Sequence, residues 1–321
     1  MKKLTCALAL LGAVAFGSTA AAADPIGITW MGKPVQTDAP PIADKGRVLI
    51  PLRAVSEALG ADVAWNRQTR TVTVDKWTEH LTLTPGQQVA VIEYEGGSKE
   101  TVRLDVPVKA VHDRIYVPLR FVSERFGYRI EWTDGTVSIK SPMSDEERKA
   151  LYAGDLATAR KIALKTREGG ARYEKAPLQA DHPTQNYNNE FIFPEGEALR
   201  FIYVSGGETA TLFEFKDDFL VATWQARLDP FAGDSFVQLL NGRFKDATGP
   251  MPDIGGSFYY YDTGFSGPTG WEDSGRVGAD GQIAVTASVH RDAADEIHTT
   301  GTIAYALPQE VRKETVKVPR L

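Results

Sequence analysis

Residues 47–65 have the sequence RVLIPLRAVSEALGADVAW, and residues 114–132 have the sequence RIYVPLRFVSERFGYRIEW. Pro, Leu, Arg, Val, Ser, Glu, Gly and Trp recur in both stretches at a constant offset of 67 positions. Such self-similarity indicates an internal repeat, which decides the architecture before any single element does. The motif positions are Pro51, Arg53, Glu57, Gly60 and Trp65 in the first copy, and Pro118, Arg120, Glu124, Gly127 and Trp132 in the second.

Each copy predicts a strand, a short helix and a hairpin. The β-branched run before Pro51 favours a strand, which the proline closes because it has no amide proton. Gly60 suits the left-handed residue that ends a helix. Asp134-Gly135, flanked by strand-like runs, is typical of a hairpin turn. Between strand and glycine, apolar side chains at helical spacing should be buried: Leu52, Val55 and Leu59, then Leu119, Val122 and Phe126.

The two copies are expected to form one compact α+β domain with pseudo-two-fold symmetry. Neither copy offers enough core alone, so their strands should share a sheet. Trp65 and Trp132 are expected to be packing anchors, which would make each worth roughly 3–5 kcal/mol if buried. Arg53 and Arg120 each have a glutamate four residues on, and the resulting helical ion pairs indicate support of the fold rather than ligand binding.

This motif resembles the copper amine oxidase N-terminal-like domain, also called the stalk domain, over about residues 25–140. The stretches at residues 28–35 and 101–108 fit the same pattern. The resemblance implies an accessory module on secreted bacterial proteins, with no copper or quinone chemistry of its own and no assigned ligand. It implies nothing about residues 145–321.

The N-terminus predicts export. Residues 1–23 combine Lys2 and Lys3, an apolar run over 4–16 and three alanines before Asp24, which is typical of a cleaved signal peptide. After cleavage no transmembrane anchor is expected, and the chain should be secreted or associated with the cell envelope. Its net charge of −6 and lack of a basic block argue against nucleic acid as a partner. Cys6 is the only cysteine, so the exported chain has no disulfide or thiolate site.

The predicted organisation is a signal peptide at 1–23, the stalk-like domain at 24–141, a helical connector at 142–180, a β-rich domain at 181–308 and a charged, loosely held tail at 309–321. Ser144 and Glu147 predict a capping box, and Gly154 should divide the connector into two helices. Short strands with tight turns favour an antiparallel sandwich or barrel. The predicted strands are 190–193, 198–204, 209–215, 219–228, 236–240, 257–261, 282–291 and 296–307.

Metal and cofactor chemistry is not expected. No His-x-His pair occurs among His80, His112, His182, His290 and His298. Asn188 stands beside Tyr187 where a quinone-forming oxidase needs an acid. A weak metal site where His290 and His298 meet across a hairpin is the alternative, but a third spaced ligand is not evident. We therefore predict no catalytic, cofactor-binding or metal-ligating residues, and no enzyme activity.

Two ligand-binding hypotheses remain for the β-rich domain. The run FYYY at residues 258–261 should send alternate side chains to opposite faces of a strand. If Tyr259 and Tyr261 are exposed, they form with Trp271 an aromatic platform for a glycan or cell-wall polymer. The protein would then be a non-catalytic binding or scaffold protein, whose partner is such a polymer or another envelope protein. The alternative is a secreted hydrolase that uses a pair of carboxylates among Asp217, Asp218, Asp229, Asp234 and the loop from Asp262 to Asp273.

Overall fold

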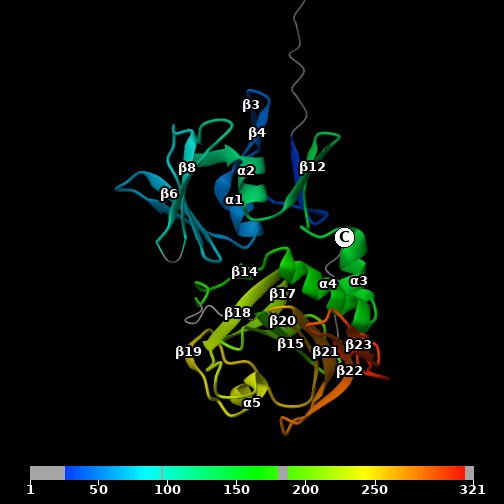
Figure 1. Ribbon diagram of the computed structural model, residues 1–321. Coiled ribbons are helices and arrows are strands. Elements are labelled where there is room, and N and C mark those ends of the chain that lie inside the picture. The colour runs from blue at the N-terminus through cyan, green and yellow to red at the C-terminus, as the bar shows by residue number, and fades with distance from the viewer. Residues whose placement is uncertain (1–25, 95–96, 180–186, 315–321) are drawn as a thin grey trace, which may run out of the picture.

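The computed structural model describes residues 26–94, 97–179 and 187–314, so the predicted signal peptide lies outside the described residues. Strands predominate and form two bodies, one above the other in Figure 1. The predicted β-rich character is confirmed. No helix in the described ranges is long and apolar enough to cross a bilayer.

The N-terminal body contains three sheets around two short helices, α1 (Leu52–Ala58) and α2 (Leu119–Arg125). One sheet has the order β12 (Arg129–Thr133), β13 (Thr136–Lys140), β1 (Gly27–Trp30), β2 (Lys33–Pro34). The second is β10 (Lys109–Val111), β11 (Arg114–Pro118), β4 (Arg47–Pro51), β3 (Ile42–Asp44). The third is β5 (Asp62–Asn66), β6 (Thr71–Lys76), β7 (Glu79–Leu83), β8 (Val89–Tyr94), β9 (Lys99–Arg103).

The two copies of the motif meet in the second sheet, as predicted. β4 and β11 pair antiparallel, and Ile50 lies opposite its equivalent residue Val117. The helices bury the six apolar side chains that the spacing indicated. Pro51 and Pro118 close their strands, and Gly60 and Gly127 follow the helices with φ of +73° and +85°. The copies therefore use the same local chemistry to build one shared core.

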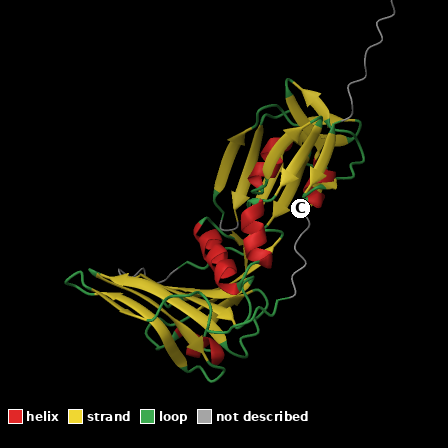
Figure 2. Ribbon diagram, turned by 90° about the vertical axis from the view of Figure 1, so that its right-hand side faces the viewer, coloured by secondary structure: helices red, strands yellow, loops and turns green. Residues whose placement is uncertain are grey.

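Two helices connect the bodies. α3 (Asp145–Ala153) begins at Ser144, where the predicted capping box with Glu147 is present. Gly154 ends α3, and α4 (Leu156–Glu168) follows, as predicted. Both helices lie between the N-terminal body and the large C-terminal sheet (Figures 1 and 2). Arg148 of α3 is buried and bonds Asp218 at 2.8 Å, which ties α3 to the turn that precedes β18.

The C-terminal sheet is one continuous ten-stranded sheet rather than the predicted sandwich or barrel. Its path is β14 (Arg172–Tyr173), β18 (Phe219–Arg227), β17 (Thr209–Lys216), β16 (Arg200–Ser205), β15 (Tyr187–Pro194), β20 (Phe258–Ser266), β21 (Thr269–Val277), β22 (Ile283–Arg291), β23 (Ile297–Thr300), and β19 (Lys245–Thr248) pairs with β18. Helices rather than a second sheet pack against its central strands, while β22 and β23 are largely exposed. α4 packs on one face and α5 (Ser235–Leu240) on the other.

Three further expectations for this half need correction. Residues 236–240 form α5 rather than a strand, because the Asp234 side chain accepts the Val237 amide and caps a helix. The segment from Asp262 to Asp273 is not a loop, since it belongs to β20 and β21. The tail is not loosely held at its start, because Glu310 is buried against Arg160 of α4, with two charged hydrogen bonds of 2.6 and 2.8 Å.

Candidate functional site

The aromatic run at residues 258–261 alternates across β20, but it does not form an exposed platform. Phe258 and Tyr260 belong to the core under α5, and Tyr259 and Tyr261 belong to the core under α4. Tyr259 is 1 % exposed and Tyr261 is 8 % exposed. The condition for an aromatic platform is therefore not met by these two tyrosines, because the sheet is covered on both faces at β20.

Trp271 of β21 is partly buried, and its indole nitrogen makes a hydrogen bond. Its indole Nε1 donates a hydrogen bond of 2.9 Å to Oδ2 of Asp262 on the neighbouring strand. Trp271, the third residue of the predicted platform, is therefore hydrogen-bonded to a carboxylate instead of being free to stack on a ligand. That carboxylate lines a pocket on the α5 face, which we call the acid pocket.

The acid pocket has a volume of about 360 Å³ and is built from three segments of chain. β15 supplies Asn188 and Glu190, β20 supplies Tyr260 and Asp262, and the start of α5 supplies Asp234 and Ser235; glycines, Pro230 and Ile283 complete the wall. Among these described lining residues there is no Lys, Arg or His. The pocket therefore gathers carboxylates without a basic side chain in its wall.

Strand register sets the central pair of carboxylates. Glu190 of β15 lies directly opposite Asp262 of β20. Directly opposite residues of an antiparallel pair share one face, with Cβ atoms roughly 4.5–5.5 Å apart. Oε1 of Glu190 accepts hydrogen bonds from Ser235 Oγ at 2.9 Å and from Asn188 Nδ2 at 3.2 Å. Ser235 and Asn188 therefore orient Glu190, and Trp271 orients Asp262.

Burial disfavours the charged form of both acids. Desolvation raises the pKa of Glu190 to about 7, against the hydrogen bond from Ser235, and the charges of Asp262 and Asp234 raise it further. Desolvation also raises the pKa of Asp262 to about 6, against the hydrogen bond from Trp271, with the Asp273 charge contributing. Two acids that titrate near neutral pH in one pocket are what a functional site commonly shows.

Two oxygens at this pocket remain without a partner among the described residues. They are Oδ1 of Asn188 and Oδ1 of Asp262, and both are buried acceptors. A buried acceptor without a donor is costly, so each such atom in a folded protein needs an explanation. A ligand with N–H donors and a positive charge would satisfy the two oxygens and stabilise the carboxylates.

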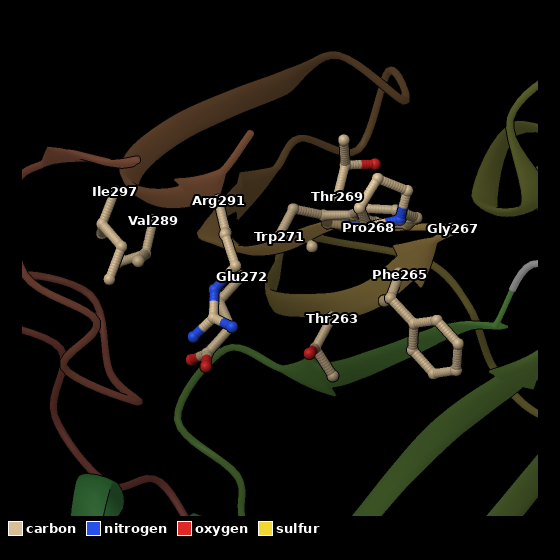
Figure 3. Close-up of a pocket in the computed structure, with 12 residues that line it drawn as sticks. Thr263, Phe265, Gly267, Pro268, Thr269, Trp271, Glu272, Val289, Arg291 and Ile297 are labelled. Atoms are coloured by element: carbon tan, nitrogen blue, oxygen red, sulfur yellow. The ribbon is translucent and has the colours of Figure 1, made fainter. Parts of the chain in front are cut away.

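A second hollow, of about 390 Å³, lies nearby around the β20–β21 turn. Figure 3 shows Thr263, Glu272 and Arg291 pointing to the same side of the sheet, with Phe265 at the edge of the hollow. The hydroxyl of Tyr261, which was predicted to bind a ligand, instead donates a hydrogen bond of 3.2 Å to Glu272 and helps to position that lining residue. This hollow is lined by a carboxylate and a guanidinium, and it lacks the opposed pair of acids that distinguishes the acid pocket.

Comparison with known proteins identifies the N-terminal body. Residues 29–141 match the copper amine oxidase N-terminal domain family. The predicted resemblance over about residues 25–140 is confirmed, and the match stops before α3. The chain is also similar to a protein named "Protease inhibitor" from Brevibacillus choshinensis, with 29 % identity over 141 residues. That alignment covers 43 % of this chain and 41 % of the relative, so it spans less than half of either.

Within the copper amine oxidase N-terminal domain, the motif residues divide into buried and exposed sets. The ion pairs are present, with Arg53 and Glu57 at 3.8 Å and Arg120 and Glu124 at 3.5 Å, on the exposed sides of α1 and α2. Trp65 and Trp132 are 40 % and 54 % exposed, so the burial on which their expected cost of truncation depended is not found. Both lie on β5 and β12, outer strands of their sheets, where the face they occupy is not covered.

The sequence could have indicated part of the acid pocket. Alternation along β15 places Asn188 and Glu190 on one face, and alternation along β20 does the same for Tyr260 and Asp262. What the pattern does not contain is the pairing of these two strands, which lie about seventy residues apart. The predicted strand at 190–193 also began too late to include Asn188.

Proposed function

We propose that this chain is an exported, non-catalytic binding protein of the bacterial cell envelope, in which a duplicated N-terminal domain carries a ligand-binding β-rich domain. The acid pocket is its binding site, and its ligand is a cell-wall polymer that bears primary amino groups. The observation that carries this proposal is the opposed pair of partly buried acids, Glu190 and Asp262, beside two buried acceptor atoms that have no partner among the described residues. The signal-like sequence at residues 1–23 and the accessory family of the N-terminal domain support it.

The chemistry of the pocket selects the ligand class. An ammonium group has three donors and no acceptor, which matches a wall of carboxylate and amide oxygens. Its charge favours the ionised acids, so binding should lower their pKa values and release protons near neutral pH. A neutral, N-acetylated polymer offers neither the charge nor the same donors. The pocket should therefore distinguish an amino sugar from its acetylated form.

Titration calorimetry with residues 24–321 tests this proposal. A glucosamine oligomer should bind with proton release, measured from the dependence of heat on buffer ionisation, whereas the N-acetylated oligomer of the same length should not bind. Glu190→Gln and Asp262→Asn should weaken binding and reduce the proton release. Glu272→Gln, in the other hollow, is the matched control and should change neither. Equal binding of the two oligomers would contradict the proposal.

A second candidate function is a secreted glycoside hydrolase. The specific observation in its favour is that one acid of the pair, Glu190, has a pKa near 7 and could serve as the proton donor. The same oligomers decide between the candidates. Release of shorter sugars that stops in both Glu190→Gln and Asp262→Asn would establish the hydrolase, and binding without cleavage would leave the binding protein.

A further inference from the structure

The hairpin of β22 and β23 collects metal-ligating side chains on one face. His290 lies directly opposite His298, so the predicted meeting across a hairpin is confirmed. Two residues further along each strand, the Asp292 amide donates to the Glu296 carbonyl at 3.0 Å, which continues the pairing toward the turn. Alternation then places Asp292 and Glu296 on the same face as the histidines.

Three of these side chains converge. Ligand atoms of Asp292, Glu296 and His298 all lie within 4.8 Å of one another. Oδ2 of Asp292 is 3.1 Å from Nε2 of His298. Oδ1 of Asp292 accepts the amides of Ala294 and Glu296, both at 2.9 Å, which fixes this carboxylate while its other oxygen faces the imidazole. Asp292 is thus oriented toward His298 before any ion arrives.

We propose that Asp292, Glu296 and His298 form a site for a divalent transition metal of the zinc type. Imidazole nitrogen with carboxylate oxygen is a donor set that suits zinc, whereas calcium prefers six to eight oxygens. Tetrahedral ligands about 2.0–2.1 Å from zinc lie roughly 3.3 Å apart, so the three side chains need only a small closure. Glu296 and His298 are exposed and can make this movement. Water would take the remaining position.

Two other histidine–aspartate pairs show what distinguishes this site. His80 lies 2.8 Å from Asp75, and His290 lies 3.1 Å from Asp273. Neither pair has a third ligand atom within the same distance in the described ranges of the chain. A pair of ligands binds zinc weakly, whereas a third ligand from the same hairpin adds affinity that exceeds the cost of ordering its side chain. His80 therefore provides a matched control.

Zinc titration of residues 24–321 against a chromogenic chelator tests the site. We expect one saturable equivalent in the unaltered protein, and at least a tenfold weaker affinity in His298→Asn and in Glu296→Gln. His80→Asn should retain the affinity. Amide hydrogen exchange gives a second readout, because zinc should slow exchange in residues 290–300 and leave residues 71–83 unchanged. Absence of a saturable equivalent, or an equal loss in His80→Asn and His298→Asn, would overturn the proposal.

Discussion

At the scale of single residues, Glu190 shows how the surroundings of a strand residue change its pKa. Its side chain is placed by alternation along β15, but its pKa is set by burial and by neighbouring carboxylates. In the unfolded chain the same carboxyl group titrates near its ordinary pKa. Between these two pKa values the native state holds more protons than the unfolded state, so native stability must fall as pH rises through this window.

We predict that the free energy of unfolding decreases from about pH 4.5 to about pH 7 through Glu190, by on the order of 3 kcal/mol. Urea unfolding across this range should show the decrease in the unaltered protein and a flatter profile in Glu190→Gln. Glu147→Gln is the control, because the hydrogen bond from Lys165 lowers the Glu147 pKa to about 2, so that its effect falls at acidic pH. Parallel profiles for the unaltered protein and Glu190→Gln would contradict the prediction.

A second prediction concerns the tryptophans of the motif. Because Trp65 and Trp132 are partly exposed, Trp65→Ala should cost less than about 2 kcal/mol, well below the cost of truncating a buried aromatic residue. Phe126→Ala, at a 1 % exposed site in α2's C-cap, should cost roughly 3–5 kcal/mol. Denaturant unfolding measures the free energy of unfolding of both variants. A loss in Trp65→Ala as large as that in Phe126→Ala would show that Trp65 is a packing anchor after all.

At the scale of elements, α4 is held from two sides. Its apolar residues pack on the C-terminal sheet, and its Arg160 is enclosed by the segment that follows β23. Arg160 and Glu310 are 0 % and 1 % exposed, and the Arg160 guanidinium also stacks on Tyr259 at 4.7 Å. Arg312 donates to the carbonyls of Leu151 and Gly154 at the end of α3. Residues 309–314 are therefore a structural part of the helical connector.

We predict that Glu310→Gln destabilises the protein by roughly 3–5 kcal/mol, because it leaves the buried Arg160 charge uncompensated. Lys165→Met removes an ion pair on the solvent side of the same helix, where Lys165 lies 2.8 Å from Glu147, and should destabilise the protein far less. Thermal unfolding of the two variants makes the comparison. Equal melting temperatures would show that the buried pair contributes nothing.

At the scale of the whole molecule, the two bodies share a core. Phe219 of β18 packs edge-on against Trp77 and Tyr128 of the copper amine oxidase N-terminal domain, with ring centroids 5.0 Å away in both cases. Gly127 lies beneath this contact. A Cβ atom there would come within 2.9 Å of the Phe219 ring and 2.6 Å of Arg172. The equivalent Gly60 has open space around it.

The repeat therefore supplies an internal control for the contact between the bodies. Gly60→Ala should cost only the left-handed backbone conformation, about 1–2 kcal/mol. Gly127→Ala adds overpacking, for a further loss of about 1–3 kcal/mol, and should separate the unfolding of the two bodies. Differential calorimetry should show a second transition in Gly127→Ala alone. Identical traces for the two variants would show that the contact does not couple the bodies.

The sequence by itself determined the features that arise from contacts within a few residues. Periodicity and caps identified α1, α2 and the buried side chains of the motif, and Ser144, Glu147 and Gly154 defined the two connecting helices. These predictions were correct because a cap, a turn or a helical face depends on neighbours that the sequence places in order. The resemblance to an N-terminal accessory domain rested on the same local pattern.

Only the tertiary structure decided which faces are covered and which distant strands pair. The pairing of β15 with β20 brought Glu190 to Asp262, and α4 and α5 buried the tyrosines that alternation alone left open. The packing of distant elements also left Trp65 and Trp132 exposed and buried the side chain of Glu310. A side chain's environment depends on elements far away in the chain, and alternation fixes only the face to which that side chain points.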